Sequence, residues 1–272
     1  MAGLIDWEML WALTTSPLMS KPQMWDDFAS RYDGYSSLEQ EYTWHQIDAL
    51  RIEPADTVLD VGAGTGRISI PVARRARSVI ALDISASMLE RVRKNAEKAA
   101  LANIETLHLQ WDQVVPGETV PVHDVVIASR SPAASDLAKL NALARKYVYI
   151  MLFCGPSLKH FHDTLVEGIN PKPLTAAPPQ RPSPMPGFAL LFNRVINMGY
   201  AANVSYVVDG FSRTYADWAA VWSDFAWLEL PETAEDRFRQ NISPYLTDSS
   251  GGLQLRMETR TAVVWWAKGD RL

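Results

Sequence analysis

The feature that most constrains this chain is the stretch over residues 57–83, TVLDVGAGTGRISIPVARRARSVIALD. A short apolar run is followed by a loop with three alternating glycines, a helical pattern and a second apolar run that ends on a carboxylate. This order predicts a strand, a loop, a helix and a second strand. A glycine-rich turn before a helix lets a ligand approach the backbone and meet the positive helix N-terminus, and Asp83 can accept hydrogen bonds from vicinal hydroxyls. The stretch therefore predicts a site for a ligand that carries a ribose.

Two positions indicate which ribose ligand the loop suits. A dinucleotide site has the pattern G-x-G-x-x-G, but Arg67 occupies the place of the third glycine, which comes one residue early at Gly66. Asp60 precedes Gly62 by two residues, where it would lie badly beside a pyrophosphate but suits an ammonium group. S-adenosylmethionine (SAM) has an ammonium group and a ribose but no phosphate. The alternative is a Rossmann-like turn that binds nothing, although three alternating glycines then cost conformational entropy without a return.

The segment DVGAGTG resembles the first motif of the class I SAM-dependent methyltransferases, an acidic residue and one spacer followed by G-x-G-x-G. The resemblance implies a Rossmann-like, doubly wound α/β fold with a seven-stranded sheet, mostly parallel with an antiparallel last strand. It implies N-terminal helices and helical insertions that cover the site. The implied cofactor is SAM, with S-adenosylhomocysteine (SAH) as its product.

The resemblance also implies which residues contact the cofactor. Ile84 and Met88 would lie beside the adenine ring, and Asp112 would accept a hydrogen bond from the adenine amino group. On composition alone, Met88 suits the core equally well and Asp112 suits a helix cap or a solvated loop. The expected cofactor-binding residues are Asp60, Gly62, Ala63, Gly64, Thr65, Gly66, Asp83, Ile84, Met88, Asp112, Gln113 and Ser129.

Composition excludes several classes of protein. The chain has 272 residues, of which 47% are hydrophobic and 21% charged, as is ordinary for a globular protein. The net charge of -5 predicts no broad basic surface, so we expect no nucleic-acid partner. Cys154 is the only cysteine and cannot form an internal disulfide. No apolar run is long enough to span a bilayer, and the first residues do not resemble a signal peptide, so we expect a cytoplasmic protein without a membrane partner.

We expect one domain with insertions. Its parts are a helical cap over residues 1–50, a SAM-binding core over 51–154 and a C-terminal part over 155–272. The C-terminal part includes a proline-rich loop at 171–186, which is either a lid over the site or a disordered spacer. It also includes a helical insertion at 211–250 before the last strand. Aromatic residues three and four apart predict one helical face there, suited to core packing or to a wall of the acceptor pocket, and they are Phe211, Tyr215, Trp218, Trp222 and Phe225.

The resemblance implies that the acceptor lies where the fourth strand, at 124–128, ends in SRSPAASD. Enzymes that methylate exocyclic nucleobase amines usually have an Asn or Asp, two prolines and an aromatic residue there, and that motif is absent. Arg130 could bind an anionic group or be an ordinary surface arginine. Residues 25–33 resemble a segment, W-x-x-x-A-x-x-Y-D, with which many small-molecule methyltransferases cover the site. The expected substrate-binding residues are Trp25, Tyr32, Arg130, His160, Trp218 and Trp222.

Methyl transfer from a sulfonium is an in-line displacement, so the main task of the protein is to orient the reactants. A general base is needed only if the nucleophile must lose a proton, and the candidates are His160, His45 and Tyr32. Each histidine is also open to a structural role. The spacing of His160, His162 and Asp163 is poor for a metal site, so no metal is expected. We expect a small-molecule acceptor, whereas methylation of a protein side chain and SAM binding without turnover remain alternatives. The sequence indicates no oligomeric state.

Overall fold

A computed structural model of the protein describes residues 5–13, 40–169 and 187–272. Trp25 and Tyr32 lie outside the described residues, as does the proline-rich loop at 171–186. The helical cap over 1–50 and the choice between lid and spacer therefore stay predictions.

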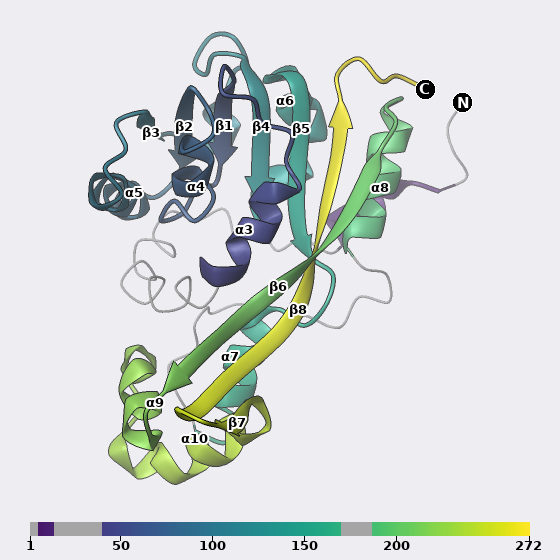
Figure 1. Ribbon diagram of the computed structural model, residues 1–272. Coiled ribbons are helices and arrows are strands. Elements are labelled where there is room, and N and C mark those ends of the chain that lie inside the picture. Colours follow the sequence, from purple (N-terminus) through teal and green to yellow (C-terminus); the bar gives the residue numbers. More distant parts are fainter. Residues whose placement is uncertain (1–4, 14–39, 170–186) are drawn as a thin grey trace.

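The core is a mixed β-sheet, as expected from the resemblance (Figure 1). The order of strands in the sheet is β3-β2-β1-β4-β5-β8-β6. Strand β7 pairs with β8 and is additional to the seven expected strands. Strands β1 to β5 pair in parallel, whereas β8 is antiparallel to β5, β6 and β7. The strands are β1 (Thr57–Val61), β2 (Ser78–Asp83), β3 (Ile104–His108), β4 (His123–Ser129), β5 (Ala144–Phe153), β6 (Asn203–Tyr215), β7 (Leu246–Ser249) and β8 (Gly252–Ala267).

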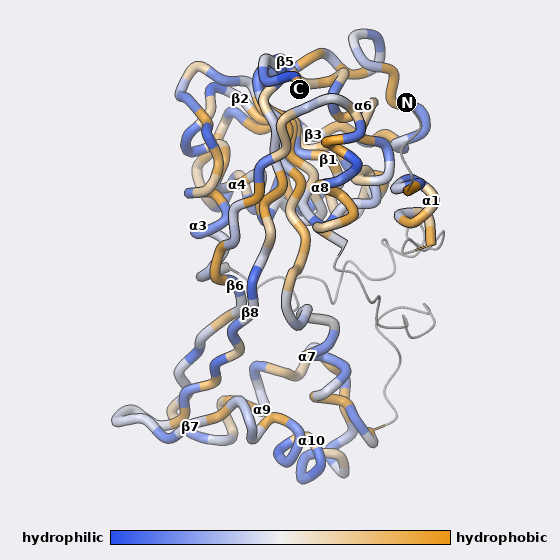
Figure 2. The backbone as a smooth tube through the Cα atoms, turned by 90° about the vertical axis from the view of Figure 1, so that its right-hand side faces the viewer, coloured by the Kyte–Doolittle hydropathy of each residue, from blue (hydrophilic) through white to orange (hydrophobic). Residues whose placement is uncertain are grey.

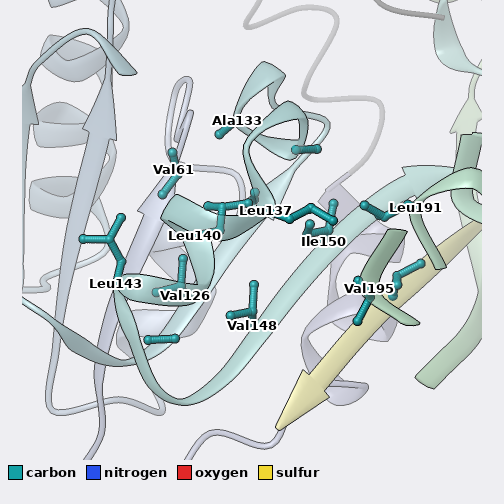
Figure 3. Packing of buried hydrophobic residues seen from close by; sticks show 14 of the residues in the cluster. Val61, Val126, Ala133, Leu137, Leu140, Leu143, Val148, Ile150, Leu191 and Val195 are labelled. Atoms are coloured by element: carbon teal, nitrogen blue, oxygen red, sulfur yellow. The ribbon is translucent and has the colours of Figure 1, made fainter. Parts of the chain in front are cut away.

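Helices cover both faces of the sheet because the central strands are apolar on both sides. One face packs against α3 (Gln40–Asp48), α4 (Ser69–Ala73) and α5 (Ala86–Lys98). The other face packs against α1 (Trp7–Ala12), α6 (Leu137–Ala142) and α8 (Gly187–Asn197). Figure 3 shows this second layer, where Leu137 and Leu140 of α6 meet Val126 and Val148 of the sheet. Among the described residues, no helix is long and apolar enough to cross a membrane.

Strands β6 and β8 extend beyond the other strands as a two-stranded ribbon (Figures 1 and 2). The partners of β5 on β8 lie at Thr261–Ala267, and residues 253–260 of β8 pair with β6 alone or with β6 and β7. The ribbon carries a second lobe, the distal lobe (residues 157–169 and 210–258), which includes α7 (Leu158–Leu165), α9 (Trp218–Asp224) and α10 (Glu235–Ile242). This lobe has its own hydrophobic core around Phe161, Phe211 and Phe238.

The predicted helical face over residues 211–225 is wrong in its first part. Phe211 and Tyr215 belong to β6, where they pair with Met257 and Leu253 of β8, and α9 begins only at Trp218. The error has a simple cause, because a spacing of four residues fits the period of a strand as well as that of a helix. Between β6 and β8 the chain contains α9, α10 and β7.

The ribbon leaves the core at Asp209 and Gly210 of β6. Gly210 has φ +127°, and a Cβ atom there would lie 2.1 Å from the carbonyl oxygen of Met257, so only glycine fits. Asp209 is fully buried, and its Oδ2 accepts hydrogen bonds from Arg130 Nη2 (2.5 Å), Thr261 Oγ1 (2.5 Å) and Gln46 Nε2 (3.0 Å). This carboxylate therefore ties the base of the ribbon to β4, β8 and α3.

A second buried charge, Arg194 of α8, holds the segment that follows β4. Its guanidinium donates to the carbonyl oxygens of Ala134 (2.9 Å) and Ser135 (2.7 Å) and pairs with Glu8 of α1. The same group lies 4.9 Å from the centre of the Trp11 ring. Arg194 thus fixes the short 3₁₀ helix Pro132–Ser135.

Candidate active site

The candidate site is a cavity of about 590 Å³ at the carboxyl ends of β1, β2 and β4. The order of the sheet reverses between β1 and β4, and open α/β sheets bind ligands in the crevice outside this switch point. The loop after β1, the residues after β2 and β3, and the segment from Ser129 to Asp136 form its walls. The cavity thus lies where the glycine loop predicted a ligand.

Gly62 shapes the floor of the cavity. Its N–H group donates to the carbonyl oxygen of Leu82 at 2.8 Å, which bends the chain directly after β1. Its φ is +75°, and a Cβ atom would lie 2.4 Å from Ser131 Oγ and 2.9 Å from Ser131 Cβ. Glycine is required here both for the backbone conformation and for the close approach of the segment after β4.

Two buried carboxylates stand on either side of this loop. Asp60 of β1 accepts a hydrogen bond from Ser69 Oγ at 2.6 Å, and Asp83 at the end of β2 accepts from the N–H groups of Gly64 (2.8 Å) and Ser85 (2.9 Å). Burial raises the pKa of Asp60 to about 6, although the hydrogen bond from Ser69 and the charge of Arg67 oppose the shift. Burial also raises the pKa of Asp83. The charged form of a buried carboxylate with a raised pKa is stabilised when a cation or a hydrogen-bond donor approaches.

An apolar wall continues from Asp83 through Ile84, Met88 and Leu109 to Trp111 and Asp112. Two residues of this region were not expected from the sequence. Lys139 of α6 donates from Nζ to the carbonyl oxygen of Trp111 at 2.8 Å, and Nζ lies 5.0 Å from the centre of the indole ring. The position of Trp111 beside Asp112 was the available signal, because an aromatic ring next to an expected adenine contact can stack on the base.

The opposite wall is polar. Ser129, Arg130 and Ser131 follow β4 and line the cavity, and Arg67 joins them from the glycine loop. Arg130 has φ +54°, and its guanidinium stacks 3.5 Å from the centre of the Phe153 ring while it pairs with Asp209. Ser129 and Arg130 were expected here from the sequence, whereas Arg67 was not.

Several expected residues do not line the cavity. Thr65 is buried and Gln113 is exposed, and a Cβ atom on Gly66 would face Ile70 and Val92 instead. The ring nitrogen Nδ1 of His45 lies 3.0 Å from the carbonyl oxygen of Val208 on β6. The expected cofactor-binding residues that do line the cavity are Asp60, Gly62, Ala63, Gly64, Asp83, Ile84, Met88, Asp112 and Ser129.

The remaining candidates lie in the distal lobe and not at the strand ends that form the cavity. His160 is exposed on α7, Trp218 Nε1 donates to Glu235 Oε1 at 2.5 Å, and Trp222 packs edge-on against Phe238. The cause is the length of β6 and β8, which carry α7 and α9 outward on the ribbon (Figure 1). In the described part of the chain, no three His, Cys, Asp or Glu side chains could hold a metal ion.

Comparisons with known proteins point to the same part of the chain. Residues 58–148 match the model of a methyltransferase domain. An uncharacterized protein of Haemophilus influenzae is 29% identical over 192 residues, which are 68% of this chain and 66% of that protein. The 23S rRNA (uracil(1939)-C(5))-methyltransferase RlmD of Alcanivorax borkumensis is 34% identical over 116 residues, 41% of this chain and 26% of that enzyme. The structure of the YcgJ protein from Bacillus subtilis has the same fold, with a TM-score of 0.53, 13% identity and coverage of 85% of this chain and 99% of that chain.

The fold and the cavity define a Rossmann-like α/β domain with a nucleoside-type site at the switch point of its sheet. Residues 58–148 are a methyltransferase domain, and SAM is the cofactor of this domain. The chain spans 66% of the length of the Haemophilus protein and 26% of that of the Alcanivorax enzyme.

The residues present fit this cofactor. Asp60 offers a buried anion for an ammonium group, Asp83 offers carboxylate oxygens for ribose hydroxyls, and Ile84 and Met88 offer an apolar surface for a purine ring. The glycine at position 62 lets Ser131 approach the loop between the two carboxylates. Asp60 lies beside the glycine loop, where a pyrophosphate would favour a cation.

The close approach at Gly62 leads to a first prediction. In Gly62→Ala, the strained φ and the overlap with Ser131 are expected to destabilise the protein by about 1–3 kcal/mol and to weaken SAH binding at least tenfold. Thermal unfolding and calorimetric titration would measure the two effects. Gly117→Ala is the matched control, because Gly117 also has a positive φ (+81°) but no atom within 4 Å of its Cβ position. Equal SAH affinity in the two variants would contradict the role given to Gly62.

The raised pKa of Asp60 leads to a second prediction. Below pH 6 Asp60 takes up a proton and can no longer pair with an ammonium group, so SAH affinity should fall about tenfold between pH 7.5 and pH 5. The folding stability of the ligand-free protein has the opposite pH dependence. A carboxylate whose pKa is raised in the folded state contributes stability at low pH, and this stability is lost as pH rises through 6. Titrations with SAH and with 5′-methylthioadenosine, which lacks the ammonium group, separate Asp60 from Asp83. A pH dependence that is identical for both ligands would contradict the assignment.

Proposed function

We propose that the protein transfers a methyl group from SAM to a small-molecule acceptor by in-line displacement. One observation carries the proposal. The cavity presents Asp60, Asp83 and the apolar wall at Ile84 and Met88 in the order in which SAM presents its ammonium group, ribose and adenine. The same cavity continues to the polar wall at Arg130, where an acceptor would be adjacent to the methyl group.

The residues of this chain would act by binding and orientation. When bound, SAM supplies an activated methyl group on a sulfonium, which needs a nucleophile in line with the leaving sulfur. Asp60 on β1 would hold the ammonium group of the cofactor and Asp83 on β2 its ribose, and the buried wall at Met88 would exclude water from one side. Arg130 is held by Asp209 and Phe153, so its guanidinium orients an acceptor without first having to be ordered itself.

A small acceptor is supported by charge. The net charge of the chain is -5, and the exposed surface of the distal lobe includes acidic residues such as Asp217, Glu232 and Asp236. A nucleic-acid backbone gains affinity from cationic rather than acidic surfaces. RNA methylation is the second candidate, favoured by the similarity to the 23S rRNA methyltransferase RlmD, but that similarity covers 41% of this chain.

The test is to incubate the full chain with labelled SAM and separated cell fractions of metabolites, RNA and protein. The proposal predicts label in the metabolite fraction that withstands both ribonuclease and protease. Label that ribonuclease releases would support the RNA candidate, and label that protease releases would support methylation of protein side chains. SAH binding without any label would indicate a SAM-binding protein that does not transfer the methyl group.

A further inference from the structure

We propose that the open edge of β6 pairs with the same edge of a second copy of the chain, so that two sheets join into one across a two-fold axis. Strand β6 ends the sheet, and among the described residues no strand lies on its side away from β8. Figure 2 looks toward this side of the sheet, where β6 lies between α3 and α8. The open edge is defined here as residues 203–207 of β6, and its pairing does not depend on the proposed function.

The backbone groups of every second residue on β6 point away from β8. Nδ1 of His45, on α3, lies 3.0 Å from the carbonyl oxygen of Val208, and the N–H group of Gly210 donates to the side chain of the preceding residue at 2.8 Å. Both groups thus have partners other than β8, and residues along an antiparallel strand alternate in the side to which their groups point. Val204 and Tyr206 therefore present N–H and C=O groups at the open edge, before the part of β6 that His45 covers.

This edge lacks the features with which proteins usually keep strand edges apart. Residues 203–208 read NVSYVV, without a charged residue or a proline. Strand β6 pairs with β8 from Asn203 to Tyr215 without a change of register, so no bulge twists the edge away. The side chains beside it are apolar and reach water, since Tyr206 is 56% exposed and Val208 is 39% exposed. An edge of this kind readily forms backbone hydrogen bonds with another strand.

The same strand of a second copy fits this edge. In an antiparallel pair centred on Ser205, Val204 lies opposite the partner's Tyr206, and the two-fold axis repeats this contact with the roles exchanged. Each of these two pairs can exchange two backbone hydrogen bonds, because their groups point outward. An aromatic ring directly opposite a β-branched side chain is a favourable cross-strand pair. Farther along, Val208 would lie opposite the partner's Ala202, so no like charges meet and the contact closes at two copies.

Sedimentation velocity of the full chain, at concentrations up to about 100 µM, measures the association. The open edge is short, so we expect a dimer that dissociates on dilution. Tyr206→Lys places a charge at the edge and removes both aromatic contacts, so the dissociation constant of the dimer should rise about tenfold or more. Thr214→Lys is the matched control, because Thr214 is exposed on the same strand but lies in the distal lobe, and it should leave the dimer unchanged.

Cysteine cross-linking tests the register of the pair. At the two-fold axis Ser205 would face its own copy as a pair without backbone hydrogen bonds, in which the Cα atoms lie about 4.5 Å apart. This separation is within the range of a disulfide. Since Cys154 is the only cysteine of the chain, Ser205→Cys is made in a Cys154→Ser background. With copper phenanthroline as the oxidant, it should form a covalent dimer at least about tenfold faster than Thr214→Cys in the same background.

Three results would overturn the proposal. They are a monomer at every concentration, a dimer that Tyr206→Lys leaves as stable as Thr214→Lys does, and equal rates of cross-linking for the two cysteine variants. If Tyr206→Lys does not fold, as judged by circular dichroism, the cross-linking rates decide the question. An edge that binds a different protein would leave the purified chain a monomer, which also rejects a second copy as its partner.

Discussion

Replacing Asp83 with alanine is expected to weaken SAH binding about 100-fold or more. Asp83 lies at the carboxyl end of β2, where its carboxylate would accept hydrogen bonds from both ribose hydroxyls. Each hydrogen bond to a charged group contributes about 1.5–3 kcal/mol, so the loss of two exceeds a hundredfold in affinity. The variant also removes the acceptor of the Gly64 and Ser85 N–H groups, which loosens the glycine loop itself. Calorimetric titration with SAH measures the effect.

Two further variants make this experiment specific. Asp83→Asn keeps one carbonyl oxygen as an acceptor, so its loss of affinity should lie between those of wild type and alanine. Asp248→Ala, on the exposed strand β7 of the distal lobe, removes an aspartate from the surface and should leave SAH affinity unchanged. If Asp83→Ala bound SAH as tightly as Asp248→Ala does, the assignment of the ribose site would be wrong.

Asp209→Ala is expected to cost about 3 kcal/mol or more of unfolding free energy. The variant leaves the guanidinium of Arg130 in a largely buried place without this partner, and removing one member of a buried ion pair typically costs about 3–5 kcal/mol. Thr261 and Gln46 lose their acceptor as well. Urea unfolding followed by circular dichroism measures the difference. Thr261→Val removes one donor to the same carboxylate and should cost only about 1 kcal/mol. Equal destabilisation by the two variants would show that the ion pair is not the main contribution.

Local patterns of the chain were sufficient to predict that Asp60, Gly62 and Asp83 lie together at the glycine loop. Asp60, Gly62 and Asp83 lie within a few tens of residues and belong to one strand-loop-helix-strand unit, so the covalent chain itself brings them together. The strands of the sheet could be predicted for the same reason, because each buried strand is a short apolar run and each turn contains residues typical of turns. The order of the strands came from the resemblance rather than from any pattern.

Contacts between distant residues could not be predicted in this way. Asp209 meets Arg130 and Gln46 across 79 and 163 residues, and no periodicity in the sequence signals such a pair. Arg67 carried no separate signal, because an arginine at the start of a helix is ordinary in a surface segment. Trp218 and Trp222 were expected near the acceptor because they are large and aromatic, but aromatic rings serve equally well as the core of the distal lobe.

The position of β8 in the chain has a consequence for biosynthesis. This strand pairs with β5, β6 and β7, yet it follows all of them in the sequence. While residues 252–267 are still inside the ribosome, β5 and β6 each lack this neighbour and present unpaired backbone groups, the kind of edge that invites aggregation. The same strand completes both lobes, since its residues 252–260 belong to the distal part of the ribbon and its residues 261–267 pair with β5. The sheet of the nascent chain is therefore complete only after β8 has emerged, and a chaperone that covers open strand edges would act in that interval.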